Sequence, residues 1–291
     1  MTNMDQYIEK ANVLIEALPY IRDFEGKTVV IKYGGAAMTD PVLRNSTAED
    51  IVLMKYVGMN PVVVHGGGPA INEMLKRLGV KSQFSPQGLR ITDDATIEVV
   101  EMVLAGKVNK DIVSLLNIHG GEAIGISGKD GNLLFAEKIE TEDGTDIGHV
   151  GQLTEVHSSI IDNICRTGLI PVIAPIATDK NGGTWNINAD TAAGEVAGAL
   201  RAEKLVFLTD TPGLLQNVDD PDSLIHKLRS SDVTKLRDSG VIAGGMIPKV
   251  GACLHALEHG VRKTHIIDGR VPHSLLLEIF TAKGLGTLVT G

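Results

Sequence analysis

Short, continuously apolar runs alternate with helical patterns along most of the chain, and this alternation limits the possible folds. The runs are rich in β-branched residues, which is typical of parallel strands buried on both faces. They lie at residues 29–31, 62–64, 123–126, 172–176 and 205–208. Helical patterns lie between them at 71–78, 95–116, 157–167 and 191–200. We therefore predict an α/β fold with a central, mostly parallel sheet and helices on both faces.

Composition agrees with this fold and argues against several classes of function. The 291 residues suffice for one large domain or two lobes, and with 3% aromatics the core must consist of aliphatic side chains. The net charge of -9 argues against nucleic acid or an anionic membrane as the main partner. No apolar segment approaches ~18 residues, so we expect a soluble protein. Cys165 and Cys253 show no metal-ligand spacing, which favours a reducing compartment, either the cytoplasm or an organelle such as the plastid stroma.

The first 21 residues are predicted to form a helix that precedes the first strand. Apolar residues on one face share helical spacing: Met4, Tyr7, Ile8, Ala11, Leu14, Ile15 and Leu18. Thr2 with Asp5 resembles a capping box, and Pro19 with Gly26 is expected to end the helix. Two interpretations of the apolar stripe stay open. It packs on its own domain, or the helix is an arm that pairs with another subunit.

Two further segments bear on the organisation of the chain. Residues 132–153 are polar and rich in turn formers, and we expect a hairpin there that departs from the main sheet. A boundary between two lobes is expected near residue 200, because the polar loops after it differ in kind from those before it.

Three glycine clusters mark the expected ligand site, because ligands of open α/β sheets bind beyond the carboxyl ends of the strands. We place all three at such ends: Lys32-Tyr33-Gly34-Gly35, His65-Gly66-Gly67-Gly68-Pro69 and Gly244-Gly245-Met246. Glycines let backbone N–H groups approach an anion closely. Any one cluster could be an ordinary turn, but three together favour binding of phosphate and carboxylate. The P-loop pattern G-x-x-x-x-G-K-[S/T] is absent from the sequence.

Two lysines accompany these clusters. Lys32 ends the first apolar run, and Lys249 follows the third cluster. Either one alone could be a solvated surface lysine. Together they suit phosphoryl transfer, in which catalysis consists mostly of positioning and charge stabilisation. At an effective dielectric constant of ~20, a lysine 4 Å from a unit negative charge contributes about 4 kcal/mol.

Polar residues elsewhere could complete such a site. If residues 186–190 are extended, Asn186, Asn188 and Asp190 point to the same side, where a ligand could be their polar partner. Asp190 could pair with the two lysines, or it could simply cap the helix that follows. Arg90 lies beside a turn and suits bidentate binding of a carboxylate, although a surface ion pair is the alternative. No H-x-x-H or H-E-x-x-H spacing predicts a metal site, and core or loop roles are expected for His65 and His119.

Five motifs, taken together, resemble those of the N-acetylglutamate kinase family within the amino acid kinase superfamily. They are V-I-K-Y-G-G, V-V-V-H-G-G-G-P, G-L-R-I-T, N-I-N-A-D and G-G-M-I-P-K-V, in that family's order. The similarity runs from Thr28 to Gly291 and implies a three-layer αβα sandwich of the amino acid kinase fold. It also implies an N-terminal helical arm (1–25), an N-lobe that binds the amino acid (26–200) and a C-lobe that binds ATP (201–291).

The activity that this resemblance implies is phosphorylation of the γ-carboxylate of N-acetyl-L-glutamate by ATP with Mg²⁺, a step in arginine biosynthesis. Lys32 and Lys249 would stabilise the transition state, and Asp190 would organise them. The implied substrate contacts are Gly67, Gly68, Arg90, Asn186 and Asn188. The implied nucleotide contacts are Gly34, Gly35, Asp210, Gly245 and Met246. No catalytic base is required, because the acceptor carboxylate is already ionised at pH 7.

The N-terminal helix is similar to that of the arginine-inhibited branch, in which such helices join dimers into a hexameric ring. That resemblance implies a hexamer, a trimer of dimers, with arginine as inhibitor. The implied arginine contacts are Tyr20, His265, Glu278 and Gly284. The sequence departs from relatives at Ala36, where they often carry Ser or Asn. Residues 217–223 form a longer loop than in the shortest relatives, and no role is assigned to it.

Other functions stay open at this point. The chain could phosphorylate another amino acid or carbamate. It could also be a catalytically silent arginine sensor that assembles with a nitrogen-signalling regulatory protein, although the intact Lys32, Asp190 and Lys249 argue against silence. A Rossmann oxidoreductase is disfavoured, because Ile71 stands where the last glycine of G-x-G-x-x-G would be.

Overall fold

An eight-stranded, mostly parallel sheet forms the centre of the molecule, as predicted. The computed structural model describes residues 3–85, 88–141, 144–281 and 284–291. The strand order is β12-β14-β13-β11-β1-β2-β8-β5, and β14 runs antiparallel to β13. The strands are β1 (Thr28–Tyr33), β2 (Asn60–His65), β5 (Ala123–Ser127), β8 (Ile170–Ala174), β11 (Lys204–Thr209), β12 (Lys227–Arg229), β13 (Lys263–Asp268) and β14 (Thr287–Thr290). The central position of β1 brings Lys32 to the middle of the sheet's carboxyl edge.

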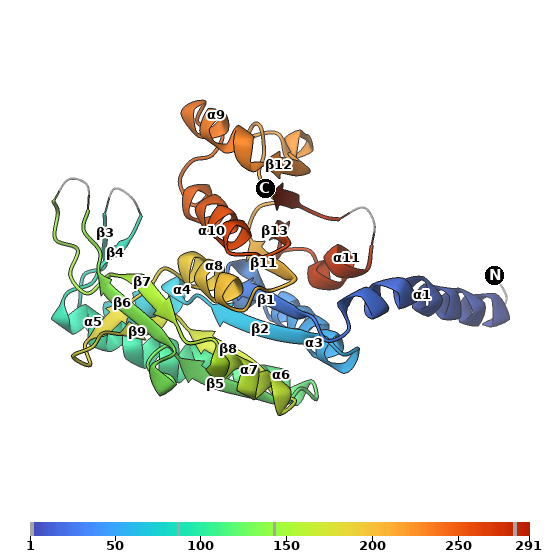
Figure 1. Cartoon of the computed structure of the whole chain (residues 1–291), viewed down its shortest axis with the longest axis horizontal. Coiled ribbons are helices and arrows are strands. Elements are labelled where there is room, and N and C mark those ends of the chain that lie inside the picture. Colours follow the sequence, from blue (N-terminus) through green and yellow to red (C-terminus); the bar gives the residue numbers. More distant parts are fainter. Residues whose placement is uncertain (1–2, 86–87, 142–143, 282–283) are drawn as a thin grey trace.

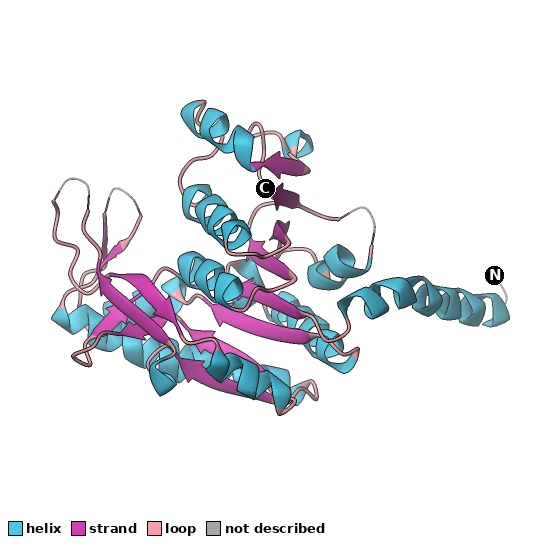
Figure 2. Ribbon diagram, in the orientation of Figure 1, coloured by secondary structure: helices cyan, strands magenta, loops and turns pink. Residues whose placement is uncertain are grey.

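Helices cover both faces of this sheet, so the αβα sandwich is confirmed (Figures 1 and 2). Side chains of β1 alternate between the faces: Val29 and Ile31 belong to one buried cluster and Val30 to the other. The first cluster is covered by α2 (Ala36–Thr39), α3 (Pro41–Tyr56), α4 (Gly68–Arg77), α5 (Asp94–Glu101), α6 (Asn109–Ile118) and α11 (Ser274–Phe280). The second is covered by α7 (Ser159–Arg166), α8 (Ala189–Ala199), α9 (Val233–Asp238) and α10 (Met246–Glu258).

A smaller sheet contains the predicted hairpin. Its order is β10-β9-β6-β7, with β6 (Leu134–Lys138), β7 (Gly151–Val156), β9 (Ile176–Thr178) and β10 (Thr184–Asn186). Strands β6 and β7 pair antiparallel, which confirms the hairpin expected over 132–153. The prediction of one strand over 172–176 is wrong. Pro175 lies between β8 and β9, and because proline has no N–H to donate to a ladder, the chain leaves the main sheet there for the smaller one.

The helical pattern over 95–116 is also interrupted. Between α5 and α6 the chain forms a wider, π-helical segment, Met102–Val108, labelled η1. Such segments are rare and often occur near functional sites. A short two-stranded ladder, β3 (Gln83–Phe84) with β4 (Arg90–Ile91), positions Arg90.

The N-terminal helix α1 (Asn3–Phe24) projects away from the body of the molecule (Figure 1). Pro19 lies inside it, so the expectation that Pro19 ends the helix is wrong, and Thr2 of the expected capping box lies outside the described residues. The apolar stripe is exposed in the single chain, with Leu14 73% and Ile15 66% accessible, so the interpretation that it packs on its own domain is wrong. Within the described ranges, no helix combines the length and the apolar character that a membrane span needs.

Candidate active site

One buried carboxylate joins the two predicted lysines. Lys32 Nζ lies 3.0 Å from Asp190 Oδ1, and Lys249 Nζ lies 2.9 Å from Asp190 Oδ2. The three residues come from β1, α8 and α10, and the exposed fractions of their side chains are 12%, 8% and 16%. Burial alone would raise the pKa of Asp190, but the charges of Lys32 and Lys249 outweigh it and hold that pKa below its usual value. An ionised Asp190 therefore fixes two ammonium groups side by side.

The cap of α8 is Asn188, so the alternative in which Asp190 caps the helix is wrong. Asn188 Oδ1 accepts hydrogen bonds from the N–H groups of Asp190, at 2.8 Å, and Thr191, at 3.2 Å. The helix begins at Ala189, so Asn186, Asn188 and Asp190 do not share one face of an extended strand as expected. Capping by Asn188 instead places Asp190 in the first turn, where the helix dipole also favours a negative charge.

The first glycine cluster folds against its neighbours on the sheet. A Cβ on Gly34 would lie 2.5 Å from Lys32 Nζ, so a side chain there would displace the ammonium group. Gly35 has φ +66°, and a Cβ on it would overlap the carboxylate of Asp210, which follows β11. The N–H of Ala36 donates to Asp210 Oδ1. Asp210 therefore closes this loop through the backbone, which is why the departure at Ala36 leaves the loop intact.

The second cluster, Gly66-Gly67-Gly68, lies between two hollows and is called the central glycine loop below. The first, the Lys32 hollow, is also lined by Lys32, Gly34 and Gly35. The second, the Arg90 hollow, is also lined by Arg90, Asn186 and Asn188. All five predicted substrate contacts therefore line the Arg90 hollow, and two of them, Gly67 and Gly68, also line the Lys32 hollow.

Arg90 is buried, with 8% of its surface exposed, so the surface ion pair is wrong. Its Nη1 donates to Ser82 Oγ, and its guanidinium carbon lies 4.7 Å from the centre of the Phe84 ring. Among the described residues no carboxylate pairs with it. Burial lowers its pKa. A buried cation without an anionic partner is costly, and a carboxylate ligand in the Arg90 hollow would supply that partner.

The third cluster does not follow a strand, contrary to our expectation. After β11 the chain forms β12 and α9, and the cluster follows α9. Its Gly245 is the cap residue of α10. Lys249 also donates to the Gly245 carbonyl at 3.2 Å. This cluster therefore positions Lys249, while Gly245 and Met246 line neither the Lys32 nor the Arg90 hollow.

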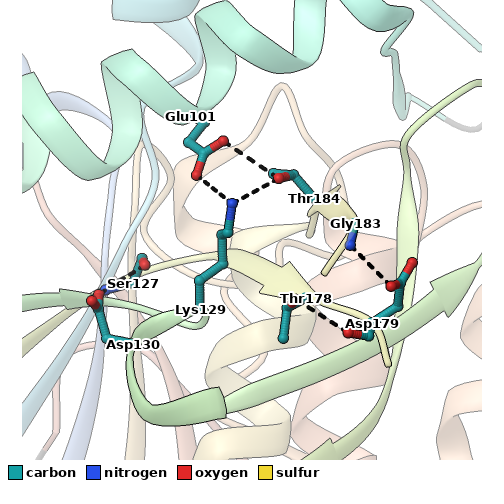
Figure 3. Close-up of polar contacts among 8 residues, drawn as sticks. All are labelled: Glu101, Ser127, Lys129, Asp130, Thr178, Asp179, Gly183 and Thr184. Atoms are coloured by element: carbon teal, nitrogen blue, oxygen red, sulfur yellow. Dashed lines mark hydrogen bonds and ion pairs between the residues drawn. The ribbon is translucent and has the colours of Figure 1, made fainter. Parts of the chain in front are cut away.

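A polar cluster missed from the sequence lies at the start of β10, the strand that carries Asn186 (Figure 3). Lys129 Nζ donates to Glu101 Oε1 at 2.8 Å and to Thr184 Oγ1 at 2.9 Å, joining the end of α5 to β10. Asp179 Oδ1 accepts from Gly183 N at 2.9 Å and fixes the turn before β10. The next strand residues include Asn186, whose Nδ2 contacts Thr92 Oγ1 at 3.3 Å. Only tertiary contact identifies the partners of Lys129, because Glu101, Lys129 and Thr184 lie far apart in sequence.

The four residues implied for arginine binding line one separate hollow. Tyr20, His265, Glu278 and Gly284 meet there with Lys204, which the sequence analysis missed. Glu278 Oε1 lies 3.1 Å from Lys204 Nζ and 2.9 Å from His265 Nε2, and Glu278 Oε2 accepts from Leu285 N at 3.1 Å. Burial would raise the pKa of Glu278, but these partners dominate and lower it to about 2.

Comparison with known proteins agrees with this architecture. Residues 27–268 match the sequence profile of the amino acid kinase family. The chain is 58% identical to acetylglutamate kinase of Heliobacterium modesticaldum, over 97% of this chain and 98% of that protein. It is 51% identical to acetylglutamate kinase of Methanocaldococcus jannaschii, over 99% of this chain and 98% of that protein.

Solved structures extend the comparison to the fold. N-acetylglutamate synthase from Neisseria gonorrhoeae, complexed with coenzyme A and N-acetyl-glutamate, superposes with a TM-score of 0.84 at 29% identity, covering 97% of this chain and 63% of that one. Giardia carbamate kinase superposes with a TM-score of 0.65 at 16% identity, covering 91% and 99%, and so shows the fold alone. From the site geometry and these similarities together, the chain belongs to the amino acid kinase family and, within it, to the acetylglutamate kinases.

Proposed function

We propose that the protein transfers the γ-phosphoryl group of ATP to the γ-carboxylate of N-acetyl-L-glutamate, forming N-acetyl-L-glutamyl 5-phosphate and ADP in arginine biosynthesis. The observation that carries the proposal is the Lys32–Asp190–Lys249 arrangement, with contacts of 3.0 and 2.9 Å. A carboxylate oxygen attacks the γ-phosphorus, the bond to the β-phosphate oxygen breaks, and no proton moves. The enzyme's task is then to bring two anions together.

The two lysines perform that task by charge. Each ammonium group about 4 Å from a phosphoryl oxygen contributes on the order of 4 kcal/mol at an effective dielectric constant of ~20. Asp190 keeps both cations in place without neutralising both of them. The charges of the two lysines therefore remain available as negative charge spreads over the transferring group.

The other predicted site residues would bind the two substrates. In the Arg90 hollow, Arg90 would hold the α-carboxylate of the substrate, and Asn186 and Asn188 would contact its amide. The central glycine loop would donate N–H groups to the reacting oxygens between the two hollows. Residues 26–200 would bind the amino acid and residues 201–291 the nucleotide. Asp210, Gly245 and Met246 would contact the nucleotide from the second of these lobes, and Gly34 and Gly35 would contact its phosphates from the first.

Magnesium is expected to arrive with ATP. No group of three or more histidine, cysteine or acidic side chains in the described part of the chain could hold a metal ion. Lys32, Arg44 and Lys107 line the Lys32 hollow together with Asp111, which pairs with Lys107. Ammonium and guanidinium groups bind phosphate oxygens rather than cations. The phosphates would therefore supply most ligands of Mg²⁺, whose charge would add to that of the two lysines.

The test is ATP turnover with N-acetyl-L-glutamate in the presence of hydroxylamine, which converts an acyl phosphate to a hydroxamate. We expect hydroxamate with this substrate and little with glutamate or carbamate. A product formed with carbamate instead would support the alternative kinase activity. The absence of hydroxamate with every acceptor would support the silent sensor. The alternative that the chain is a Rossmann oxidoreductase is wrong, because the chain belongs to the amino acid kinase family.

We further propose feedback inhibition by arginine. The observation that favours it is the convergence of Tyr20, His265, Glu278 and Gly284 on one hollow at the base of α1. A guanidinium would compete with Lys204 for the Glu278 carboxylate. Isothermal titration with arginine should show binding that Glu278→Gln abolishes. Equal binding by both proteins would contradict the assignment.

The assembly and surroundings of the protein are proposals as well. The exposed stripe of α1 favours a homo-oligomer, and by resemblance a hexamer built as a trimer of dimers. We also propose a nitrogen-signalling regulatory protein as a further partner. A location in the cytoplasm or the plastid stroma fits the cysteine content. Sedimentation of the purified protein tests the hexamer directly.

A further inference from the structure

His65 is a buried histidine next to the proposed reaction site, and the mechanism above does not use it. It ends β2, immediately before the central glycine loop, and has no exposed surface. Its Nδ1 lies 2.8 Å from the Gly66 carbonyl oxygen, and its Nε2 lies 3.2 Å from Asn109 Nδ2. Burial lowers the pKa of His65 to about 4, so the ring is neutral at neutral pH and carries one proton.

The partners determine which nitrogen carries that proton. A carbonyl oxygen accepts, so Nδ1 must donate to Gly66, which leaves Nε2 to accept from the amide of Asn109. The orientation of Asn109 is fixed in turn. Its Nδ2 donates to the Val172 carbonyl at 2.9 Å, and its Oδ1 accepts from Lys110 Nζ at 3.0 Å. Asn109 is fully buried as the first residue of α6, directly after the π-helical segment η1.

This arrangement orients one peptide group of the loop. In a trans peptide the C=O and the following N–H point in opposite directions. Because the Gly66 carbonyl is turned toward the His65 ring, the N–H of Gly67 points away from it. Gly67 is the cap residue of α4 and Gly68 its first residue, so neither N–H has a carbonyl partner within the helix.

Neighbouring contacts hold the rest of the loop. The N–H of Gly66 donates to the Tyr33 carbonyl at 2.9 Å, and the Gly67 carbonyl accepts from Ile71 N at 3.0 Å. Leu104 of η1 packs against Gly67 so closely that a Cβ there would overlap it. The free direction of the loop is therefore toward the two hollows that it lines.

We propose that His65, held by Asn109, is a positioning residue for phosphoryl transfer: its Nδ1–H fixes the Gly66–Gly67 peptide so that the Gly67 N–H meets the reacting oxygens. The proposal rests on the proposed function. It predicts that Nδ1 of His65 affects turnover by holding the central glycine loop. Nε2 affects turnover because its contact with Asn109 keeps the proton on Nδ1.

Two substitutions separate the nitrogens. The amide nitrogen of asparagine can take the place of Nδ1, and the amide of glutamine reaches the place of Nε2. His65→Asn should keep the hydrogen bond to Gly66 and retain kcat within about threefold. His65→Gln should keep the contact with Asn109 but lose the bond to Gly66, and its kcat should fall by about tenfold or more, since a fully lost donor costs ~10²-fold or more.

The KM values for ATP and N-acetyl-L-glutamate should change less than kcat in both variants. Both substitutions remove ring packing, so both should lower Tm to a similar extent. A purely structural role would reduce kcat equally in the two variants, and that outcome would overturn the proposal. Unchanged kcat in both would overturn it too.

The tautomer can be measured without substrate. Nitrogen-15 NMR of histidine-labelled wild-type protein should show His65 protonated at Nδ1 at pH 7, and Asn109→Leu should weaken that preference. A proton on Nε2 in the wild-type protein would overturn the positioning role even if the enzyme is active. Conversely, an Nδ1 proton in a protein that forms no hydroxamate would count against the proposed function alone.

Discussion

At the scale of single residues, one buried carboxylate, Asp190, holds Lys32 and Lys249 side by side. The sequence could predict that Lys32, Lys249 and Asp190 lie together, because each is a charged residue beside a glycine cluster or a polar motif. The local geometry of Asp190 could not be predicted, since Asn188 and Asp190 are both good caps and only one can serve. Glu101 and Lys129 carried no sequence signal, because two charged residues in separate segments look like surface residues until folding joins them.

Replacing Lys249 by alanine should lower kcat by ~10²-fold or more, the scale of losing one preorganised donor to the transition state. The ammonium group lies 2.9 Å from Asp190, so its removal also leaves that carboxylate with a single cationic partner. Steady-state kinetics with N-acetyl-L-glutamate measure the effect. Lys235→Ala, at an exposed position in α9, is the matched control and should be near normal. A near-normal kcat for Lys249→Ala would show that this lysine has no catalytic role.

Replacing Arg90 by glutamine should raise the KM for N-acetyl-L-glutamate by roughly 10- to 100-fold, because a charge-assisted hydrogen bond contributes about 1.5–3 kcal/mol. The KM for ATP should change little, since Arg90 lines the Arg90 hollow and not the Lys32 hollow. Arg90→Lys keeps the charge but loses the planar guanidinium. Its KM for N-acetyl-L-glutamate should therefore lie between those of the wild type and Arg90→Gln. Equal increases in both KM values would instead indicate a general distortion of the site.

The buried Glu278 should make stability depend on acid pH. Its pKa is lowered from 4.5 to about 2, so its contribution is fully present above about pH 4.5 and is lost as the pH falls toward 2. Linkage gives about 3 kcal/mol for a shift of this size. Urea unfolding should show Glu278→Gln less stable than wild type at pH 7, with a smaller difference at pH 3. A difference that does not depend on pH would argue against the contacts of Glu278 with His265 and Lys204 as its source.

At the scale of elements, the sequence predicts the positions of strands and helices well but misses their interruptions. The alternation of apolar runs is a property of many residues and survives local exceptions. A break such as Pro175, or the π-helical turn at Met102–Val108, depends on one residue or on packing against the central glycine loop. Pro19 shows the opposite case, since α1 continues through a residue that usually ends a helix.

The exposed stripe on α1 predicts that this helix joins subunits. Deleting residues 1–21 should convert the assembly to dimers and weaken inhibition by arginine, as sedimentation and inhibition curves would show. Since the deletion also removes Tyr20 from the hollow proposed to bind arginine, Leu14→Glu with Ile15→Glu separates the two effects. Glu9→Lys, on the opposite side of the helix, should leave the assembly intact. A truncated protein that still sediments as a hexamer would contradict the arm.

At the scale of the whole molecule, the two buried clusters follow the two faces of the sheet and not the two proposed lobes. The first cluster combines Val29 and Val63 with Val206 and Ile267, and the second combines Val30 with Phe207. Strands β1 and β11 pair directly across the proposed boundary near residue 200, with Val29 opposite Lys204. The two proposed lobes thus share one sheet and both hydrophobic cores, so the proposed division is one of ligand binding and not of folding units.

This shared core predicts a single cooperative unfolding transition. Neither the segment before residue 200 nor the segment after it buries a complete core alone, because each cluster needs side chains from both. Scanning calorimetry at fixed protein concentration should show one heat-absorption peak, and near-UV circular dichroism should give the same midpoint. Saturating ATP with Mg²⁺ should move that peak upward as a whole, since binding to the folded state stabilises every part that unfolds with it. Two peaks, with only one of them shifted by ATP, would show that the C-lobe unfolds as a separate domain.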